Sequence, residues 1–328
     1  MKRIIYEKIY LGASLLVLIK LFFEKKNVLV IEKENYFGGA WKIGSGKYKN
    51  LDLACHLLVP SSKNEGIKIS NFFRKFKLNV REVFKKEFYA DINRWKSYGK
   101  NGPAMICNEG WPKILNVFEG LVAKKQNIKI IKNLKVNKLV LQDQIVKVLT
   151  KDKMFLAKQV LFPSYSSLKY FYVRNKKEFL PRKKITNYHY LITLKCRSNL
   201  LVKNFQCFYS KKSKYLFDRL SVSFLKKRGD LIHTIVTARL GKIYKKKIKK
   251  INKKEISNFM TQMGLVHEIS ELKFKVIEYN CYYRDINDRK ITIKNLKKSK
   301  GKIFWLNTMY FGYFISNLLK NNKNYINK

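Results

Sequence analysis

The 328-residue chain contains few of the residues that mark several classes of protein. It has 15 glycines and 5 prolines, which excludes collagen-like and low-complexity chains. Its cysteines are odd in number and form no C-x-x-C pair, so zinc-ligand spacing is absent and a disulfide framework is not expected. We therefore expect no metal site and a location in the reducing cytoplasm. The five cysteines are Cys55, Cys107, Cys196, Cys207 and Cys281.

A long apolar run is also missing. Residues 9–19 are apolar and follow Met1-Lys2-Arg3, an arrangement that imitates a signal peptide. Lys20 ends this run below the length of a membrane span, and no small-residue cleavage site follows it. Residues 27–32 continue instead as a buried strand. The segment therefore predicts a folded N-terminus without a transmembrane helix.

Acidic residues are scarce. The chain has 22 Asp and Glu residues and 71 Lys and Arg residues, which gives a formal net charge of +49. Such a charge attracts nucleic acid, anionic lipid or phosphorylated ligands. The excess is mainly lysine spread along the chain, whereas specific base or phosphate recognition favours arginine. We interpret the charge as a solvated lysine surface that follows AT-rich codon usage. The alternative from another class is a basic nucleic-acid-binding protein, although no nucleic-acid-binding module is visible.

The N-terminal segment predicts a βαβ unit. With 46% hydrophobic residues the chain can bury a core, and its length suggests two domains. Residues 8–11 form a short apolar run, Gly12-Ala13-Ser14 a turn, residues 15–25 a helix and residues 28–31 a buried strand. Glu32 follows about 20 residues after Gly12, at the spacing of a dinucleotide site. There the turn faces a pyrophosphate and the acid accepts hydrogen bonds from a ribose.

Two blocks resemble the FAD-dependent amine oxidase superfamily, which includes protoporphyrinogen oxidase, phytoene desaturase and UDP-galactopyranose mutase. In the first block, residues 9–14 and 28–33 are followed by Gly38-Gly39-Ala40-Trp41, and residues 51–56 stand where the family has a later strand and a Gly-His-like turn. In the second, residues 108–112 precede an amphipathic helix over 113–125. Five short β runs follow, at residues 128–131, 135–141, 145–149, 154–156 and 159–162.

The resemblance implies an α/β fold with a Rossmann-like FAD-binding domain, a small β-meander and an α+β substrate domain on an antiparallel sheet. The FAD-binding domain is expected over residues 1–60, 105–170 and 291–328, and the substrate domain over 61–104 and 171–290. A C-terminal strand over 303–306 is expected to join the first sheet. The implied activity is FAD-dependent oxidation of a small-molecule substrate. The substrate, the catalytic residues and the oligomeric state stay open.

The resemblance also implies a set of FAD contacts. The turn would face the pyrophosphate, Glu32 would bind the ribose, and Val136 would offer a backbone contact to the adenine. A tryptophan at the position of Trp41 is more often a core aromatic than a neighbour of the flavin. His56 could approach the isoalloxazine ring, but it fits a hydrogen-bonded structural histidine at least as well. The implied cofactor residues are Gly12, Ala13, Ser14, Glu32, Lys33, Gly38, Gly39, Ala40, Trp41, His56, Val136, Asn307 and Thr308.

The cofactor motif departs from the family pattern at three places. Ser14 stands at the second glycine position, where its small side chain is tolerable and its hydroxyl can donate. Val17 stands at the third, where it is expected to push the helix outward by about an ångström and loosen the phosphate site. Asn307 and Thr308 replace a C-terminal Gly-Asp pair, although both residues cap helices well. These changes leave open a pseudoenzyme that has lost FAD.

A second alternative is a flavin-dependent enzyme that resembles the nucleotide-sugar mutases. Four residues suggest it because together they could hold a diphosphate. They are Arg219, Arg239, Tyr282 and Arg284.

If the charge reflects a solvated lysine surface, nucleic acid binds weakly and without sequence preference. Its affinity falls steeply with added salt, because counterion release sets it. Fluorescence anisotropy with two oligonucleotides of unrelated sequence, at several salt concentrations, measures both properties. Tight binding of only one sequence at physiological salt would contradict the interpretation.

Overall fold

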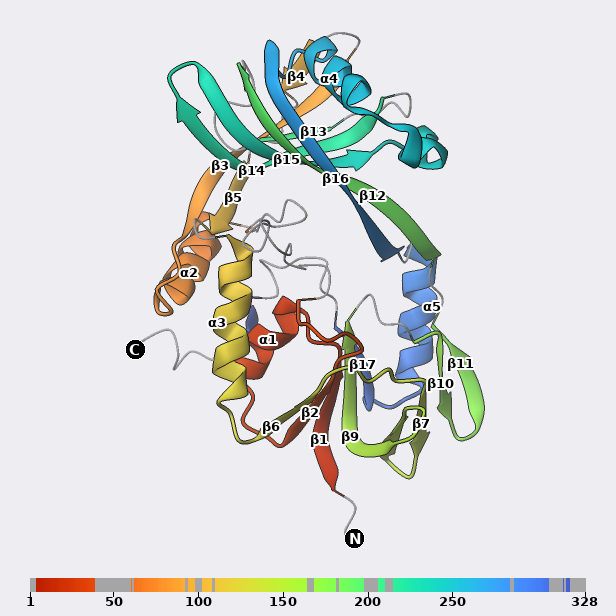
Figure 1. Cartoon of the computed structure of the whole chain (residues 1–328). Helices are drawn as coiled ribbons and strands as arrows, with labels where there is room; N and C mark the ends of the chain where they lie inside the picture. The colour runs from red at the N-terminus through yellow and green to blue at the C-terminus, as the bar shows by residue number, and fades with distance from the viewer. Residues whose placement is uncertain are drawn as a thin grey trace. The chain divides into compact units, whose positions relative to one another are not determined.

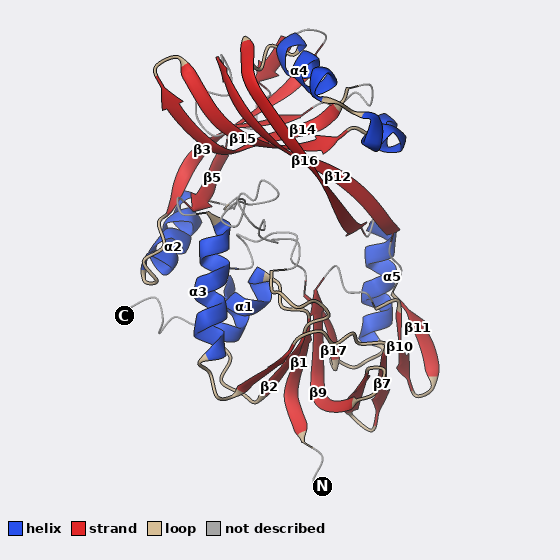
Figure 2. Ribbon diagram, viewed as in Figure 1, coloured by secondary structure: helices blue, strands red, loops and turns tan. Residues whose placement is uncertain are grey.

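The computed structural model describes residues 4–38, 60, 62–91, 94–97, 102–107, 110–163, 168–180, 183–197, 206–209, 215–283, 286–306, 315, 317 and 318. The chain divides into two units, each built from separate segments (Figure 1). The first contains Met1–Lys42, Lys113–Ile185 and Cys281–Lys328. The second contains Ile43–Pro112 and Thr186–Asn280. Each unit is organised around one large sheet (Figure 2).

The first unit begins with the predicted βαβ arrangement. Strands β1 (Ile5–Leu11) and β2 (Val28–Ile31) pair in parallel, and helix α1 (Leu15–Phe22) connects them. All four residues of β2 are buried, as expected of a parallel strand that is covered on both faces. The helix ends at Phe22 rather than at residue 25. Its last turn tightens there, because the N–H groups of Phe23 and Glu24 donate three residues back along the chain.

The first sheet runs in the order β11-β10-β7-β8-β9-β1-β2-β6. The predicted meander is present as β7 (Lys138–Gln142), β8 (Ile145–Leu149) and the start of β9 (Met154–Pro163). Strand β6 (Ile128–Ile131) lies parallel to β2, and β17 (Ile303–Leu306) lies parallel to the end of β9. The predictions that residues 128–131 and 303–306 join this sheet are confirmed.

The separation of residues 154–156 from 159–162 was wrong, because both belong to β9. Ala157 lies opposite Val146 of β8 on one side and Tyr6 of β1 on the other. A strand that is paired on both sides stays extended, so the polar residues between the two apolar runs do not form a turn. The first half of β9 thus completes the meander and its second half continues into the parallel part of the sheet.

The first unit extends beyond residue 170, where the sequence placed the change of domain. Strand β10 (Tyr170–Val173) pairs in parallel with β7, and β11 (Lys176–Phe179) forms a hairpin with β10. Helix α5 (Ile286–Lys297) contacts β11 and β17, so the C-terminal segment returns to this sheet. Helix α3 (Trp111–Ala123) packs beside α1 through an edge-to-face contact of Phe118 and Phe22.

The second unit carries a sheet in the order β16-β12-β15-β14-β13-β3-β4, with β5 also paired to β3. Among the pairs whose register is described, β13 and β3 run in parallel, and β12–β15, β14–β15, β13–β14, β3–β4 and β3–β5 are antiparallel. Helix α2 (Lys63–Arg74) contacts β3 and β5. The strands are β3 (Val80–Asp91), β4 (Arg94–Ser97), β5 (Gly102–Cys107), β12 (Lys183–Arg197), β13 (Gln206–Tyr209), β14 (Phe217–Arg228), β15 (Leu231–Leu240) and β16 (Glu268–Tyr283).

The core of the second unit lies between one face of this sheet and helix α4 (Lys253–Gln262). Tyr190 and Ala238, directly opposite each other on β12 and β15, pack in one cluster with Ile256 and Phe259 of the helix. The helix starts with a capping box of Asn252 and Glu255, which satisfies two backbone N–H groups at its end. Because side chains alternate along a strand, residues such as His189 and Arg239 lie on the other face of the sheet.

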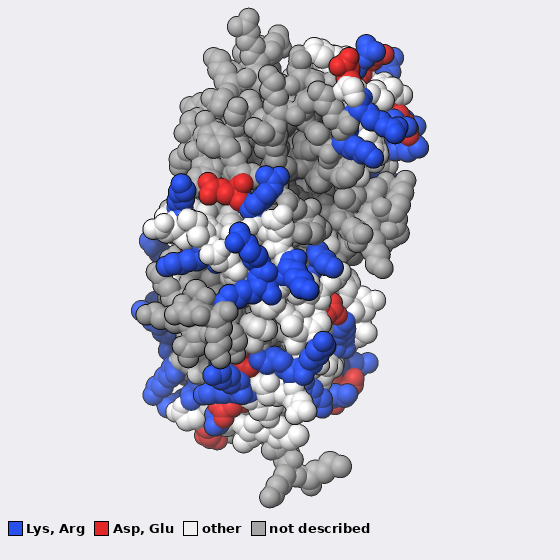
Figure 3. Space-filling view, turned by 90° about the vertical axis from the view of Figure 1, so that its left-hand side faces the viewer, with Lys and Arg blue, Asp and Glu red and all other residues white. Residues whose placement is uncertain are grey.

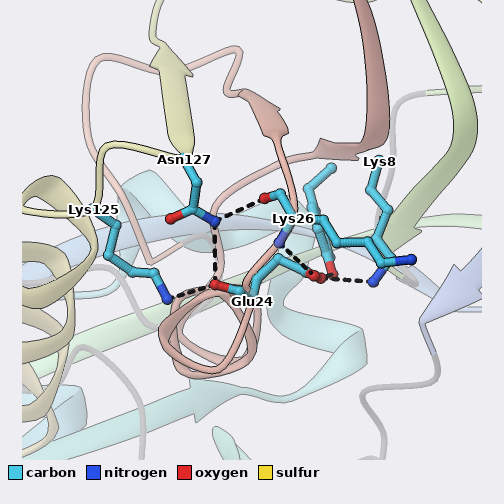
Figure 4. A network of polar contacts seen from close by, with 6 residues as sticks. Lys8, Glu24, Lys26, Lys125 and Asn127 are labelled. Atoms are coloured by element: carbon cyan, nitrogen blue, oxygen red, sulfur yellow. Dashed lines mark hydrogen bonds and ion pairs between the residues drawn. The ribbon is translucent and has the colours of Figure 1, made fainter.

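A polar network fixes the connection from α1 to β2 (Figure 4). Lys125 donates to the carbonyl oxygens of Phe22 and Glu24, at 2.8 and 2.6 Å. Asn127 donates to the carbonyl oxygens of Glu24 and Lys26, at 3.2 and 2.7 Å. The end of α1 is thereby held to the segment between α3 and β6, and its unpaired carbonyl groups are satisfied.

The Glu24 carboxylate adds an ion pair to this network. Lys8 lies 2.7 Å from Glu24 Oε2, and the hydroxyl of the buried Tyr10 donates to the same oxygen at 3.4 Å. Burial acts to raise the pKa of Glu24, but the hydrogen bond and charge of Lys8, with two backbone N–H groups, more than offset it and lower the pKa. Burial, with the Glu24 charge nearby, raises the pKa of Tyr10 beyond its ordinary range.

On the face drawn in Figure 3, Lys and Arg side chains are scattered over the described surface, and Asp and Glu are few among them. Several lysines pair with an acid at the surface, such as Lys158 with Glu7 at 2.6 Å and Lys132 with Glu119 at 3.2 Å. Exposed pairs of this kind contribute little to stability. Among the described residues, no helix has the length and apolar character needed to cross a membrane.

Replacing Glu24 with glutamine is expected to lower the free energy of unfolding at pH 7 by about 1–3 kcal/mol, because charged hydrogen bonds are lost. The folded-state pKa of Glu24 is lowered, so its contribution is complete above the ordinary value of 4.5 and is lost as the pH falls through the folded-state value. Denaturant unfolding at pH 7 and pH 3 measures the difference. The exposed Glu268→Gln is the matched control, and an equal Glu24→Gln effect at both pH values would contradict the assignment.

Candidate functional site

The turn between β1 and α1 has the backbone conformation of a dinucleotide-binding turn. Gly12 has a φ of 99°, a left-handed value that a side chain would strain. Its N–H donates to the carbonyl oxygen of Ile31 at 2.8 Å, which ties the turn to the end of β2. The next N–H, that of Ala13, donates to Glu32 Oε2 at 2.7 Å. The turn and the acid predicted to act together are therefore in direct contact.

Helix α1 begins with Ser14 as its N-cap. The carbonyl oxygen of Ser14 accepts the N–H of Leu18 at 3.0 Å, and its side-chain oxygen accepts weakly from Val17 at 3.5 Å. This hydrogen bond uses a lone pair of the Ser14 hydroxyl oxygen, so the hydroxyl hydrogen can still be donated to another group. The first turn of α1 contains no acidic residue, so no side-chain charge there opposes an anion. Val17 itself is completely buried.

Glu32 is buried, with only 5% of its surface exposed, at the carboxyl end of β2. Each carboxylate oxygen accepts one backbone N–H, since Oε1 also accepts from Glu34 at 3.0 Å. A carboxylate offers about four acceptor positions, so these two bonds orient the group and leave capacity for hydroxyl donors. The carbonyl oxygen of Glu32 accepts from Leu134 at 3.0 Å, which brings the loop before β7 to the same place.

Three further predicted residues lie around this turn. Gly38, with a φ of 106°, donates to the carbonyl oxygen of Ala13 at 2.8 Å and forms a bridge with Ser14. Lys33 is more than half exposed and pairs with Glu34 at 3.0 Å. Val136 lies two residues beyond Leu134 and packs partly buried against the core of the first sheet. The structure thus brings Gly12, Ala13, Ser14, Glu32 and Gly38 together, with Lys33 and the loop of Val136 beside them.

Other predicted residues lie outside the described part of the chain. Two groups are concerned, the loop after Gly38 and the segment after β17. They are Gly39, Ala40, Trp41, His56, Asn307 and Thr308, and Arg284 of the mutase-like alternative also lies outside it. The positions of these residues remain predictions.

Phe37 and Lys132 also lie near this turn, although no motif pointed to them. Phe37 is buried directly before Gly38, and the Lys132 ammonium lies 3.9 Å from its ring centroid. Lys132 follows β6, which is parallel to β2, so both strands end at the same edge of the sheet. The order of the strands would have indicated Lys132, because it follows the last residue of the strand beside β2. Its ammonium group also pairs with Glu119 at 3.2 Å, so its charge is compensated.

Among the described residues, no group of three or more His, Cys, Asp or Glu side chains is placed to bind a metal ion. Cys107 and Cys196 are both buried, and neither forms a disulfide. Burial raises the pKa of Cys196 to about 11, so this thiol is protonated at neutral pH.

The groups around Gly12 match the chemistry of an adenine dinucleotide. A helix N-terminus without acidic residues suits a pyrophosphate, and the oriented Glu32 carboxylate suits the hydroxyls of a ribose. The departures at Ser14 and Val17 do not disrupt the turn, since the helix is capped and Val17 is accommodated in the core. The donor and acceptor set therefore fits FAD.

No family model and no curated protein sequence matches the chain. Solved structures do match over almost its entire length. A candidate protoporphyrinogen oxidase from an Exiguobacterium species superposes with a TM-score of 0.63, at 8% identity, over 99% of this chain and 98% of that one. Cyclohexylamine oxidase from Brevibacterium oxydans gives 0.61, at 7% identity, over 99% of both chains.

Putrescine oxidase, solved with putrescine bound, gives a TM-score of 0.60 at 9% identity, over 99% of this chain and 98% of that one. These proteins are FAD-dependent members of the amine oxidase superfamily. At such low identity the likeness concerns the fold. The chain therefore has the amine-oxidase-type fold that the N-terminal motifs predicted, with a mixed sheet in one unit and a largely antiparallel sheet in the other.

Proposed function

We propose that the chain is an FAD-dependent oxidoreductase that acts on a small molecule. The observation that carries the proposal is the contact of the Glu32 carboxylate with the N–H of Ala13, at 2.7 Å, beside the N-terminus of α1. When bound, FAD supplies the redox chemistry, and the protein supplies binding, orientation and electrostatics. The amine-oxidase-type fold supports the class, and the substrate is a separate question.

The residues of the turn have distinct tasks in this proposal. Gly12 lets the backbone turn sharply enough to aim the first amides of α1 at a pyrophosphate, and the helix dipole favours the negative charge. Ser14 adds a hydroxyl donor at the helix cap. Glu32, already oriented by two backbone N–H groups, accepts from the ribose hydroxyls with little loss of conformational entropy.

The remaining predicted contacts belong to the same proposal. Lys33 and the backbone of Val136 would lie beside the adenosine, because the loop before β7 is bonded to the end of β2. The loop over Gly39, Ala40 and Trp41 would continue along the cofactor. His56, Asn307 and Thr308 would complete the site near the flavin and the pyrophosphate. We assign FAD binding to residues 1–60, 105–170 and 291–328, substrate binding to residues 61–104 and 171–290, and the protein to the cytoplasm.

The first test is the absorbance of the purified protein. An FAD-dependent enzyme purifies with flavin absorbance or acquires it on incubation with FAD. A folded protein that does neither is a pseudoenzyme, and the oxidoreductase proposal fails. Far-ultraviolet circular dichroism establishes that the sample is folded, so the absence of flavin has one interpretation.

Glu32→Ala is expected to lower FAD affinity about ten- to a hundredfold, because hydrogen bonds to a charged acceptor contribute about 1.5–3 kcal/mol each. Equilibrium titration with FAD measures the effect. Glu34→Ala is the matched control, since Glu34 is two residues away but its carboxylate pairs with Lys33 at the surface. Equal affinities for the wild type and Glu32→Ala would show that Glu32 does not bind the ribose.

Val17→Gly is expected to raise FAD affinity, because it restores the glycine that permits the closest approach of helix and strand. The same change costs about 1 kcal/mol of helix stability, and more through the cavity left by a buried side chain. Titration with FAD and thermal unfolding, done together, separate the two effects. A loss of both affinity and stability would mean that the valine suits the phosphate site of this chain.

A further inference from the structure

The hairpin at one end of the first sheet exposes aromatic side chains. Strands β10 and β11 form this hairpin, and β10 also pairs with β7 (Figure 1). Phe171 of β10 is completely buried in the core of the unit, so Tyr170 and Tyr172, which alternate with it, lie on the opposite face of the sheet. Phe179 of β11 lies directly opposite Tyr170 and is 60% exposed. Three aromatic side chains therefore share one face of the hairpin, which we call the outer face.

Lysine side chains lie over these rings. Lys177 is opposite Tyr172, and its ammonium reaches diagonally to Tyr170, 4.2 Å from the ring centroid. The same ammonium is 5.3 Å from the ring centroid of Phe179. The ammonium of Lys138, on β7, is 4.1 Å from the ring centroid of Tyr172. The two tyrosine rings meet edge to face, with their centroids 5.7 Å apart. Aromatic and cationic groups thus alternate on the outer face.

A third lysine extends the outer face to β8. Val140 of β7 lies opposite Tyr172 on one side and Lys147 on the other, so the three side chains share this face. The Lys147 ammonium donates to the neutral side-chain oxygen of Gln142 at 2.8 Å. This hydrogen bond orients the lysine without compensating its charge.

The outer face carries an excess of positive charge in the described part of the chain. No described carboxylate pairs with Lys138, Lys147 or Lys177. The acid of β11, Glu178, is buried on the opposite side of the sheet, where Lys298 lies 2.7 Å from it. A partner on the outer face would therefore gain from carrying both negative charge and flat rings.

We propose that the outer face, formed by β7, β8, β10 and β11, binds single-stranded nucleic acid without sequence preference. Unpaired bases stack on tyrosine and phenylalanine rings, and their phosphates pair with lysines along the same path. Each ammonium is carried on a flexible stem, so it can leave the ring for a phosphate while a base takes its place. A duplex fits less well, because its bases are already stacked on one another.

Two other occupants fit the outer face less well. A protein surface that lies on an anionic membrane presents its apolar and cationic groups on separate sides, whereas here they alternate. A second copy of the chain would bring the same three lysines against their equals, and like charges repel. A nucleic acid supplies both rings and phosphates, so its chemistry matches both kinds of group on this face.

Fluorescence anisotropy of the full-length protein tests the site. The probe is a labelled thymine oligonucleotide of about 15 nucleotides, single-stranded or annealed to its complement, in about 0.15 M salt. The single strand is expected to bind about tenfold more tightly than the duplex. Tyr172→Leu removes a ring but keeps an apolar side chain, and it is expected to weaken single-strand binding about tenfold. Phe304→Leu is the matched control, since Phe304 is an exposed aromatic residue on β17 of the same sheet.

Lys177→Met is expected to weaken binding of the single strand and to reduce the slope of log affinity against log salt, because one phosphate contact is lost. Its matched control, Lys246→Met, removes an equal charge from the exposed helix over Lys242–Lys250. If Lys246→Met lowers the affinity and the slope as much as Lys177→Met does, binding follows the general surface charge and the proposal is overturned.

Other results would also overturn the proposal. Equal affinity for the single strand and the duplex, or an unchanged affinity of Tyr172→Leu, would exclude stacking. If Tyr172→Leu abolishes cosedimentation with phosphatidylserine vesicles but leaves oligonucleotide binding unchanged, the outer face binds a membrane instead. If circular dichroism shows that Tyr172→Leu does not fold, Tyr170→Leu takes its place with the same expectation. The titration needs no flavin, so its outcome is independent of the proposed function.

Discussion

The crossover from β1 through α1 to β2 is the constraint on which the first unit depends. A parallel pair covered on both faces must satisfy its backbone polar groups within the protein, at both ends of the connecting helix. At one end, the side chains of Lys125 and Asn127 donate hydrogen bonds to the carbonyl groups at and after the end of α1. At the other, Glu32 binds the turn that starts the helix. The two acids of this crossover therefore differ in role. The Glu24 carboxylate pairs with Lys8 within the fold, and the Glu32 carboxylate is oriented at the candidate site by two backbone N–H groups.

The site follows from that arrangement. Because β1, β2 and β6 are parallel, their carboxyl ends meet at one edge, where Gly12, Glu32 and Lys132 come together. Backbone hydrogen bonds from Gly12 and Gly38 close the turn. A preorganised turn of this kind loses little entropy when a ligand binds. These hydrogen bonds explain how a degenerate glycine motif can retain a well-formed turn.

The sheet of the second unit differs from the first because one of its faces is apolar and the other is mostly polar. The apolar face packs under α4. On the other face, the bulge at Asp218 interrupts the regular pairing of β14 with β15. The bulge places Arg219 opposite Arg239, and the Nε of Arg239 donates to Asp218 at 2.6 Å.

The sequence by itself determined the βαβ unit, the meander, the C-terminal strand and the partnership of Gly12 with Glu32, because these depend on local periodicity and on spacing. It did not determine that residues 154–163 form one strand, since only pairing on both sides keeps Ala157 extended. Nor did it determine the role of Glu24, whose partners Lys125 and Asn127 are about a hundred residues away. The opposition of Arg219 and Arg239 was decided by a bulge in the strand register, which no periodic pattern records. Local pattern specifies an element, but only tertiary pairing specifies which charges meet, because that choice depends on register between distant segments.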